Sequence, residues 1–183
     1  MPGPVFLNGD RIALRPIEEA DLEFLQAQVN DPTIWRSIGR SRPLNGEQER
    51  DFFDNVICGD DTVDLLIGVD STPIGTIGLF EFDWEARTAE IGYWIAPDHH
   101  DRGYGTEATE CVVEYAFDQL GLHRIAAHVF EFNDPSQRLL ETVGFTKEGV
   151  HRDADFVDGE YQDVYWYGLL EDEWRRQRRD GGD

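Results

Sequence analysis

The clearest chemical pattern in the sequence is the turn Arg102-Gly103-Tyr104-Gly105-Thr106. Apolar residues up to Ala96 predict a strand before the turn, and the periodic residues from Thr106 onward predict a helix after it. The first turn of a helix has backbone N–H groups without intrahelical partners, and these groups bind anions. The two glycines place no Cβ between this backbone and a phosphate. The turn therefore predicts a phosphate site, although glycines also serve simply to make a tight strand-to-helix turn.

Two coenzymes are compatible with this pattern. The letters from Gly103 to Ala108 also satisfy the dinucleotide pattern G-x-G-x-x-A, which is typical of oxidoreductases. That pattern follows the first strand of a parallel βαβ unit and has an acidic residue about 20 positions later. Here antiparallel strands are expected before the turn, and Arg124-Ile125 stands where the acid should be. Signatures of phosphate loops, serine hydrolases and zinc proteases are absent from the sequence.

Hydrophobic periodicity and turn residues predict the elements that position the turn. The predicted strands are residues 11–15, 63–69, 74–82, 89–96, 122–130, 145–152 and 160–170, and the predicted helices are residues 18–29, 47–57, 106–120 and 133–143. Asn30-Asp31-Pro32 is expected to end the first helix. Short turns among the strands of 63–96 predict antiparallel hairpins, and the later helices predict crossovers. The expected fold class is α+β with a mixed sheet.

The charge of the chain limits its partners. The 183 residues include 38 acidic and 16 basic side chains, for a formal net charge of −22. Such a charge repels phosphate backbones, so we expect no nucleic-acid partner. The acidic residues are spread over almost every segment, which suggests a surface adapted to a salt-loving host. Only the run from Trp174 to Arg179 is basic, and it is expected to be a solvated helix end.

Other classes of protein are also disfavoured by composition. The sequence has no apolar run long enough to span a membrane, and its first residues lack the signal-peptide pattern. We therefore expect a cytoplasmic protein without a membrane partner, as a monomer or homodimer. Cys58, Cys111 and the five histidines show neither a disulfide framework nor metal-ligand spacing, so no metal cofactor is expected.

Several further segments accompany the glycine turn. They are Leu14-Arg15-Pro16, Glu90 to Pro97, Arg102 to Ala108, Asn133 with Ser136, Gly144-Phe145 and Glu148-Gly149. Together they resemble the GNAT superfamily of acetyl-CoA-dependent N-acetyltransferases, in particular its RimJ/RimL-like branch, which acetylates protein N-termini and small amines. The loop pattern of that superfamily, Q/R-x-x-G-x-G/A, begins here at His100, which departs from it.

The resemblance covers almost the whole length and implies a fold. It implies a GNAT-like domain over residues 1–183, with a C-terminal helix end or tail from about residue 171. In this fold a mixed, mostly antiparallel sheet of six to seven strands is flanked by about four helices. The implied co-substrate is acetyl-CoA, and the implied reaction is transfer of its acetyl group to a primary amine by direct attack.

The resemblance also implies roles for individual residues. The implied coenzyme contacts are the main chain of Trp94, Ile95 and Ala96 on the pantetheine arm, the amides of Arg102, Gly103, Tyr104, Gly105 and Thr106 on the pyrophosphate, and Asn133 beside the pantetheine. Ser136 is expected to protonate the coenzyme sulfur, and Glu90 to accept the amine proton directly or through water. From the residues alone, Asn133 and Ser136 are equally ordinary helix-start residues, and Glu90 an ordinary solvated strand residue.

The acceptor site is expected across the strands from the coenzyme. Its expected residues are the aromatic side chains of Trp35, Phe156 and Tyr161 and the carboxylates of Asp153, Asp155, Asp158 and Asp163. Because acidic residues occur throughout the chain, surface adaptation explains these carboxylates equally well. Two nonenzymatic alternatives stay open: a sensor that binds acyl-CoA without turnover, and a scaffold with an empty cleft.

The charge pattern predicts that salt stabilises the protein. Concentrated KCl screens the repulsion among the acidic side chains, so the free energy of unfolding should rise from dilute buffer to molar KCl. Chemical denaturation with urea at several KCl concentrations measures this change. Equal stability in dilute and molar salt would refute adaptation to a salt-loving host.

Overall fold

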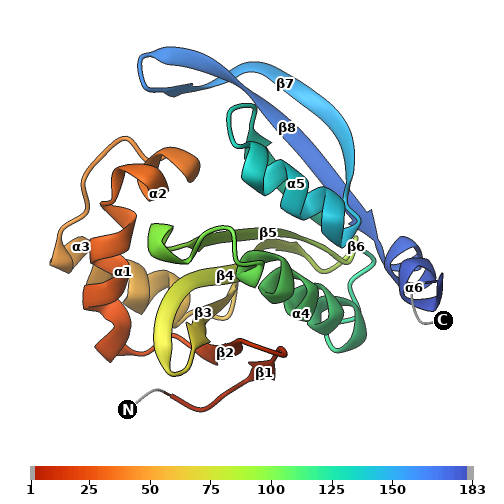
Figure 1. The fold of residues 1–183 in the computed structure, drawn as a ribbon, viewed down its shortest axis with the longest axis horizontal. Coiled ribbons are helices and arrows are strands. Elements are labelled where there is room, and N and C mark those ends of the chain that lie inside the picture. The colour runs from red at the N-terminus through yellow and green to blue at the C-terminus, as the bar shows by residue number, and fades with distance from the viewer. Residues whose placement is uncertain (1–2, 181–183) are drawn as a thin grey trace.

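A single mixed sheet organises the computed structural model, which describes residues 3–180 (Figure 1). Residues 1–2 and 181–183, the two ends of the expected domain, lie outside the described residues. Over the described range the sheet has eight strands, in the spatial order β1-β2-β3-β4-β5-β6-β8-β7. The strands are β1 (Leu7–Asn8), β2 (Ala13–Pro16), β3 (Val63–Val69), β4 (Thr72–Asp83), β5 (Thr88–Ile95), β6 (Arg124–Phe130), β7 (Thr146–Val157) and β8 (Glu160–Leu170).

Six α-helices accompany the sheet within residues 3–180. They are α1 (Leu22–Val29), α2 (Pro32–Ser37), α3 (Gly46–Phe52), α4 (Tyr104–Asp118), α5 (Asp134–Val143) and α6 (Glu171–Asp180). The π-helical turn Phe53–Ile57 continues α3. The expected fold class is confirmed, but the expected numbers of six to seven strands and about four helices were too low.

The pairing of the strands divides the sheet into two parts. From β1 to β5 every neighbouring pair is antiparallel, which confirms the predicted hairpins. The strands β6, β8 and β7 form a second antiparallel group. The two groups meet only where β5 runs parallel to β6, over the pairs Thr88–Arg124, Ala89–Ile125 and Glu90–Ala126.

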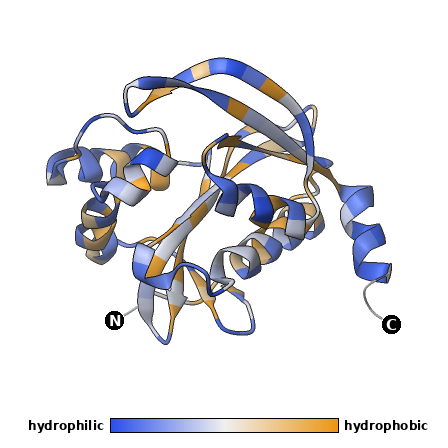
Figure 2. Ribbon diagram, turned by 45° about the horizontal axis from the view of Figure 1, so that its top comes forward, coloured by the Kyte–Doolittle hydropathy of each residue, from blue (hydrophilic) through white to orange (hydrophobic). Residues whose placement is uncertain are grey.

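The main core lies on the sheet face that α4 and α5 cover. Alternate residues of the strands point to this face, including Ile77 on β4, Ile91 on β5 and Ile125 on β6. They pack against the buried sides of α4 and α5, represented by Val112 and Leu140. Figure 2 shows hydrophobic residues along the central strands and hydrophilic residues on the outer sides of the helices. The core therefore joins both parts of the sheet to the same two helices.

A smaller core covers one end of the opposite face. Leu66 of β3 and Trp94 of β5 point to this side and pack under α1 and the end of α3. Phe24 of α1 lies against Trp94, with 5.9 Å between the ring centroids. The rest of this face is therefore not covered by these helices.

The additional elements have local causes that the sequence patterns did not reveal. Asp31-Pro32 separates α1 from α2, but it also begins α2, because the Asp31 carboxylate accepts a hydrogen bond from Thr33 N at 2.7 Å. The C-terminal basic run forms α6, and its Trp174 is buried in the main core. This run is therefore a packed helix and not only a solvated helix end. Strand β1 has only two residues, too few for a periodic pattern.

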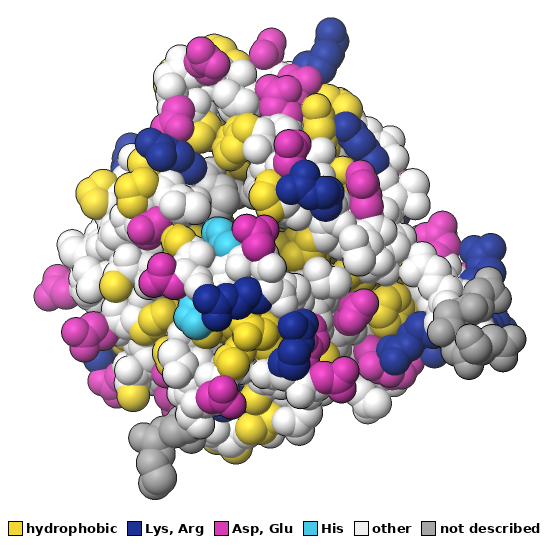
Figure 3. All heavy atoms as spheres, viewed as in Figure 1, with side chains coloured by type: hydrophobic (Ala, Val, Ile, Leu, Met, Phe, Trp, Pro, Cys, Tyr) yellow, Lys and Arg dark blue, Asp and Glu magenta, His cyan; other side chains and the backbone are white. Residues whose placement is uncertain are grey.

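The surface carries the charge that the composition predicts. Figure 3 shows acidic side chains scattered over one face of the molecule and not gathered in a single patch. The hairpin of β7 and β8 extends beyond the rest of the sheet, and nearly all of β7 is exposed (Figure 1). Within the described part of the chain, no helix combines the length and the apolar character needed to cross a membrane.

The capping contact of Asp31 predicts a measurable loss of stability. Asp31→Ala removes the acceptor for Thr33 N and should lower the free energy of unfolding by about 1 kcal/mol. Urea denaturation measures the change. Asp60→Ala is the matched control, because it removes an exposed carboxylate outside the helices and should change stability by less than about 0.5 kcal/mol. Equal effects of the two substitutions would contradict the cap.

Candidate active site at the gap between β5 and β6

A gap opens where β5 and β6 separate. Their pairing ends at Glu90–Ala126, although β5 continues to Ile95 and β6 to Phe130. The backbone of β5 beyond Glu90 has β4 on one side and no strand on the other. A cavity of about 950 Å³ occupies this region and reaches from α2 to the first turns of α4 and α5. Unpaired strand edges of this kind offer backbone donors and acceptors to a ligand.

The glycine turn lies at one end of the cavity. Gly103 has φ of 78°, a left-handed conformation that glycine adopts without strain, and it precedes the first residue of α4. Tyr104, Gly105 and Thr106 form the first turn and line the cavity, so their N–H groups lack intrahelical partners there. A Cβ on Gly105 would lie 2.9 Å from Leu139 Cδ1, so a larger residue here would require the Leu139 side chain of α5 to move. The turn therefore has the backbone conformation that the predicted anion site requires, and that site stays a prediction.

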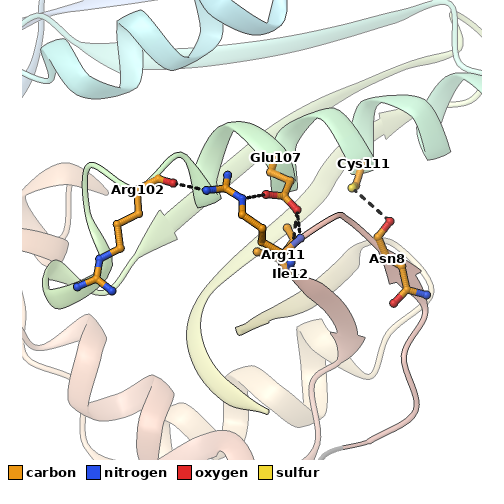
Figure 4. Close-up of polar contacts among 6 residues, drawn as sticks. All are labelled: Asn8, Arg11, Ile12, Arg102, Glu107 and Cys111. Atoms are coloured by element: carbon orange, nitrogen blue, oxygen red, sulfur yellow. Dashed lines mark hydrogen bonds and ion pairs between the residues drawn. The ribbon is translucent and has the colours of Figure 1, made fainter. Parts of the chain in front are cut away.

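Arg11 holds this turn from the N-terminal edge of the sheet (Figure 4). Its Nη1 donates to the Arg102 carbonyl at 2.8 Å, and its Nε donates to Glu107 Oε2 at 2.9 Å. Glu107 Oε1 accepts from the backbone N–H groups of Arg11 and Ile12. The carboxylate of Glu107 is thus directed to Arg11 and not to the open end of the helix. In Figure 4 the Arg102 side chain points away from this cluster.

His100 and His99 connect the turn to the end of β5. His100 Nε2 lies 2.6 Å from the carbonyl oxygen of Ile95, so this residue ties the loop to the strand. His99 also lines the cavity, and its buried Nδ1 has no hydrogen-bond partner among residues 3–180. The departure from the superfamily pattern at His100 therefore has a structural role, and His99 offers a polar atom to a bound ligand.

Ser136 and Tyr93 form a polar pair beside the gap. Asn133 begins α5, and its side chain accepts a hydrogen bond from Ser136 N at 3.3 Å. The Ser136 hydroxyl lies 2.9 Å from the Tyr93 hydroxyl, and either oxygen can donate. Burial raises the pKa of the Tyr93 phenol above its ordinary value, so this group stays protonated at neutral pH. Tyr93 was not among the predicted site residues, because its partner is 43 positions away in the sequence.

Glu90 and His128 form a second pair at the point where the strands separate. Glu90 Oε2 lies 3.0 Å from His128 Nδ1. Along β5 Glu90 shares a face with Trp94, whereas Tyr93 points to the opposite face and contacts the main core. The pair of Tyr93 and Ser136 and the pair of Glu90 and His128 therefore lie on opposite faces of the same gap.

The side of the cavity toward α2 has apolar walls and a recessed carboxylate. The walls include Ile34, Ile38, Phe52, Phe80, Phe130 and Phe132. Asp64 also lines the cavity, opposite Gly78 in the neighbouring strand, and accepts a hydrogen bond from Thr62 Oγ1 at 2.6 Å. Burial raises the pKa of Asp64, and the Thr62 hydrogen bond lowers it in part. A positively charged group would relieve the cost of this buried charge.

The residues expected to surround the acceptor do not line this cavity. Trp35 is outside the cavity lining and stacks on Arg36, whose Nε forms an ion pair with Asp158 at 2.8 Å. Phe156 and Tyr161 contact each other on the β7–β8 hairpin and are 57% and 66% exposed. Asp153, Asp155 and Asp163 also fall outside the lining. The apolar residues that line the cavity come instead from the region of α2, from α3, β4 and β6, and from the loop after β6.

The predicted coenzyme residues are largely brought together. Trp94, Ile95, Asn133 and Ser136 line the same cavity as the first turn of α4. Ala96 and Arg102 do not line it, and Ala96 N donates to the Ile74 carbonyl at 2.7 Å. Among residues 3–180, no three side chains of histidine, cysteine, aspartate or glutamate are grouped in a way that could hold a metal ion.

A family model described as an acetyltransferase (GNAT) domain matches residues 11–146. The chain belongs to the GNAT acetyltransferase family. This membership decides between the two coenzymes in favour of acetyl-CoA, the co-substrate of GNAT enzymes. The protein is accordingly an acetyl-CoA-dependent N-acyltransferase that acts on amines.

Three GNAT relatives illustrate the similarity. The uncharacterised N-acetyltransferase p20 of Bacillus licheniformis is 31% identical, over 92% of this chain and 97% of the relative. The putative ribosomal N-acetyltransferase YdaF of Bacillus subtilis is 38% identical over 60% of each chain. The crystal structure of spermidine N-acetyltransferase from Vibrio cholerae, in complex with CoA and spermine, has a TM-score of 0.85 and 26% identity, and covers 90% of this chain and 98% of that one.

The environment of the two cysteines predicts different reactivity. Burial and nearby carboxylates, first among them Glu107, raise the pKa of the Cys111 thiol to about 11. At pH 8 only about one such thiol in a thousand is ionised, so iodoacetamide should alkylate the exposed Cys58 and spare Cys111. Mass spectrometry of tryptic peptides measures both sites, with Cys58→Ser as the control. Equal alkylation of both cysteines at pH 8 would contradict this environment.

Proposed function

We propose that this GNAT enzyme transfers an acetyl group to the primary amine of a protein N-terminus or of a small molecule by direct attack. The observation that carries the proposal is the placement of two hydrogen-bonding pairs on opposite faces of the gap between β5 and β6. Ser136 with Tyr93 lies on one face, and Glu90 with His128 lies on the other. An amine can thus approach from one face while the thiol leaves on the other, without a covalent enzyme intermediate.

The coenzyme is assigned to the side of α4 and α5. We assign its pyrophosphate to the amides of the turn from Arg102 to Thr106, and the helix dipole supports this assignment. The free edge of β5 at Trp94, Ile95 and Ala96, together with Asn133, is assigned to the pantetheine arm. Ala96 N donates to β4, and in the same register the backbone of Trp94 pairs with Thr76. The Ile95 carbonyl contacts His100, so the Ile95 N–H is the most available backbone donor of the three. The unpartnered His99 Nδ1 also fits a polar coenzyme group.

Two proton transfers follow from this placement. Ser136 donates a proton to the departing sulfur, and Tyr93 orients the serine hydroxyl and can resupply its proton. Glu90 lies on the other face, where it accepts, directly or through water, the proton that the attacking amine must lose. Backbone N–H groups on the free edge of β5 are the candidates to stabilise the oxygen that becomes negatively charged.

The walls of the cavity support a cationic acceptor. Asp64 places a carboxylate among apolar side chains, and such a site favours an amine that carries an aliphatic or aromatic part. The relative from Vibrio cholerae was crystallised with spermine, a polyamine. For this chain both a small amine and a peptide N-terminus fit the chemistry of the cavity.

Several expectations from the sequence stay predictions. Residues 1–183 are proposed to act as one domain, as a monomer or homodimer, in the cytoplasm of a salt-loving host. The net charge of −22 supports the proposed absence of a nucleic-acid partner.

A thiol-release assay with acetyl-CoA and a panel of peptides, polyamines and aminoglycosides tests the function. We expect release with at least one amine, at a rate that depends on both substrates. Binding of acetyl-CoA without release on any amine would favour the sensor. Absence of binding would contradict the proposal altogether.

Ser136→Ala separates chemistry from binding. The substitution should lower kcat by about 100-fold, because the proton for the sulfur is lost, and should leave KM for acetyl-CoA within about twofold. Ser41→Ala is the control, because Ser41 is exposed and lies outside the cavity lining. Unchanged turnover of Ser136→Ala would remove Ser136 from the mechanism.

A further inference from the structure

His128 lies between Glu90 and the cavity. It is two positions beyond Ala126, the last residue of β6 that pairs with β5, and therefore points to the same face as Glu90. The cavity lining includes His128 but not Glu90. The His128 side chain is 47% exposed, whereas that of Glu90 is 20% exposed. A base must come within hydrogen-bond distance of the proton that it accepts, and His128 meets this requirement better than Glu90.

The contact with Glu90 orients the His128 ring. The carboxylate lies 3.0 Å from Nδ1, and an ionised carboxylate only accepts hydrogen bonds. The proton of the neutral ring is therefore on Nδ1, and the lone pair is on Nε2, on the far side of the ring from Glu90. This is the tautomer that can accept a proton from another molecule.

A second contact comes from the neighbouring strand. Trp166 of β8 is opposite His128 of β6, and the ring centroids are 5.3 Å apart. The indole N–H of Trp166 donates to His151 Nδ1 at 3.0 Å, which fixes the orientation of the indole. The groups that face His128 are thus the Glu90 carboxylate from β5 and the Trp166 ring from β8, with His151 of β7 behind the indole.

We infer that His128 is the catalytic base of the acetyl transfer and that Glu90 is its positioning residue. The inference rests on the proposed function and changes the role of Glu90 within it. The amine nitrogen forms a bond to the thioester carbon, and one N–H proton passes to His128 Nε2. The carbon–sulfur bond breaks, and its electron pair goes to the sulfur, which takes the proton of Ser136. His128 then returns its proton to solvent, and the serine hydroxyl regains one through Tyr93 or water.

The dependence of kcat on pH for His128→Gln and Glu90→Gln, with saturating acetyl-CoA and amine, tests the inference. His128→Gln should lower kcat at pH 7 by about 100-fold and abolish the ionisation that limits wild-type kcat at low pH. Glu90→Gln should lower kcat by about tenfold and retain that ionisation. KM for acetyl-CoA should stay within about twofold in both variants.

Two further variants separate catalysis from structure. His123→Gln replaces an exposed histidine outside the cavity lining and should leave kcat and its pH profile unchanged. His128→Ala leaves space in the cavity wall, and added imidazole should restore part of its activity. Coenzyme binding and thermal unfolding of each variant verify that the fold is intact.

The tautomer of His128, that is, which ring nitrogen carries the proton, can be measured in the absence of catalysis. Long-range nitrogen NMR of histidine-labelled protein should show His128 with its proton on Nδ1 in the wild type and a mixture of tautomers in Glu90→Gln. A wild-type pH profile in His128→Gln, or a proton on Nε2 in the wild-type ring, would overturn the inference. If the wild type turned over no amine, the proposed function would fail, and the NMR result would still decide whether Glu90 orients His128.

Discussion

Strands β5 and β6 share three residue pairs and then separate, and the rest of the molecule is arranged around this short junction. Each strand is fully paired on its outer side, β5 with β4 and β6 with β8. The backbone groups that face the gap therefore have no strand partner and depend on side chains, as the Ile95 carbonyl does on His100, or on water or a ligand. The main core holds the two parts of the sheet at a fixed distance, because both parts pack on α4 and α5. A stable core thus maintains an open sheet edge.

The two faces of the gap receive different chemistry because side chains alternate along β5. Tyr93 belongs to the face of the helices and meets Ser136 at the start of α5, whereas Glu90 belongs to the other face and meets His128. Gly78 on β4 and Gly92 on β5 lie opposite each other, and their missing side chains leave room on the second face for the side chains of Asp64 and Phe80. The proposed reaction through the gap would therefore have one hydrogen-bonded pair on each side.

Much of the fold could be predicted from the sequence, because it depends on local patterns. The strands of 63–96 have period-two alternation and short turns, and α4 and α5 have clear starts and glycine ends. The predicted end of the first helix at Asn30-Asp31-Pro32 is confirmed, but α2 was not predicted, because the same residues also start a second helix. The contacts of Tyr93 with Ser136, of Glu90 with His128 and of Arg11 with Glu107 join residues 38 to 96 positions apart. No local pattern contains such distances, and for the same reason the sequence did not indicate which aromatic residues line the cavity.

Arg11 stands in the turn between β1 and β2, yet it supports the loop that begins α4. The N-terminal edge of the sheet and the loop that begins α4 are therefore linked through these contacts. A ligand that binds the ordered loop stabilises it by mass action, and part of this free energy reaches β1 and β2 through Arg11. The coupling free energy is the same in both directions. Loss of order in the first two strands therefore lowers the ligand's binding free energy by the amount that the ligand adds to the stability of these strands. An edge strand of two residues can in this way gain order when a ligand binds a loop that is remote in the sequence but in contact with Arg11.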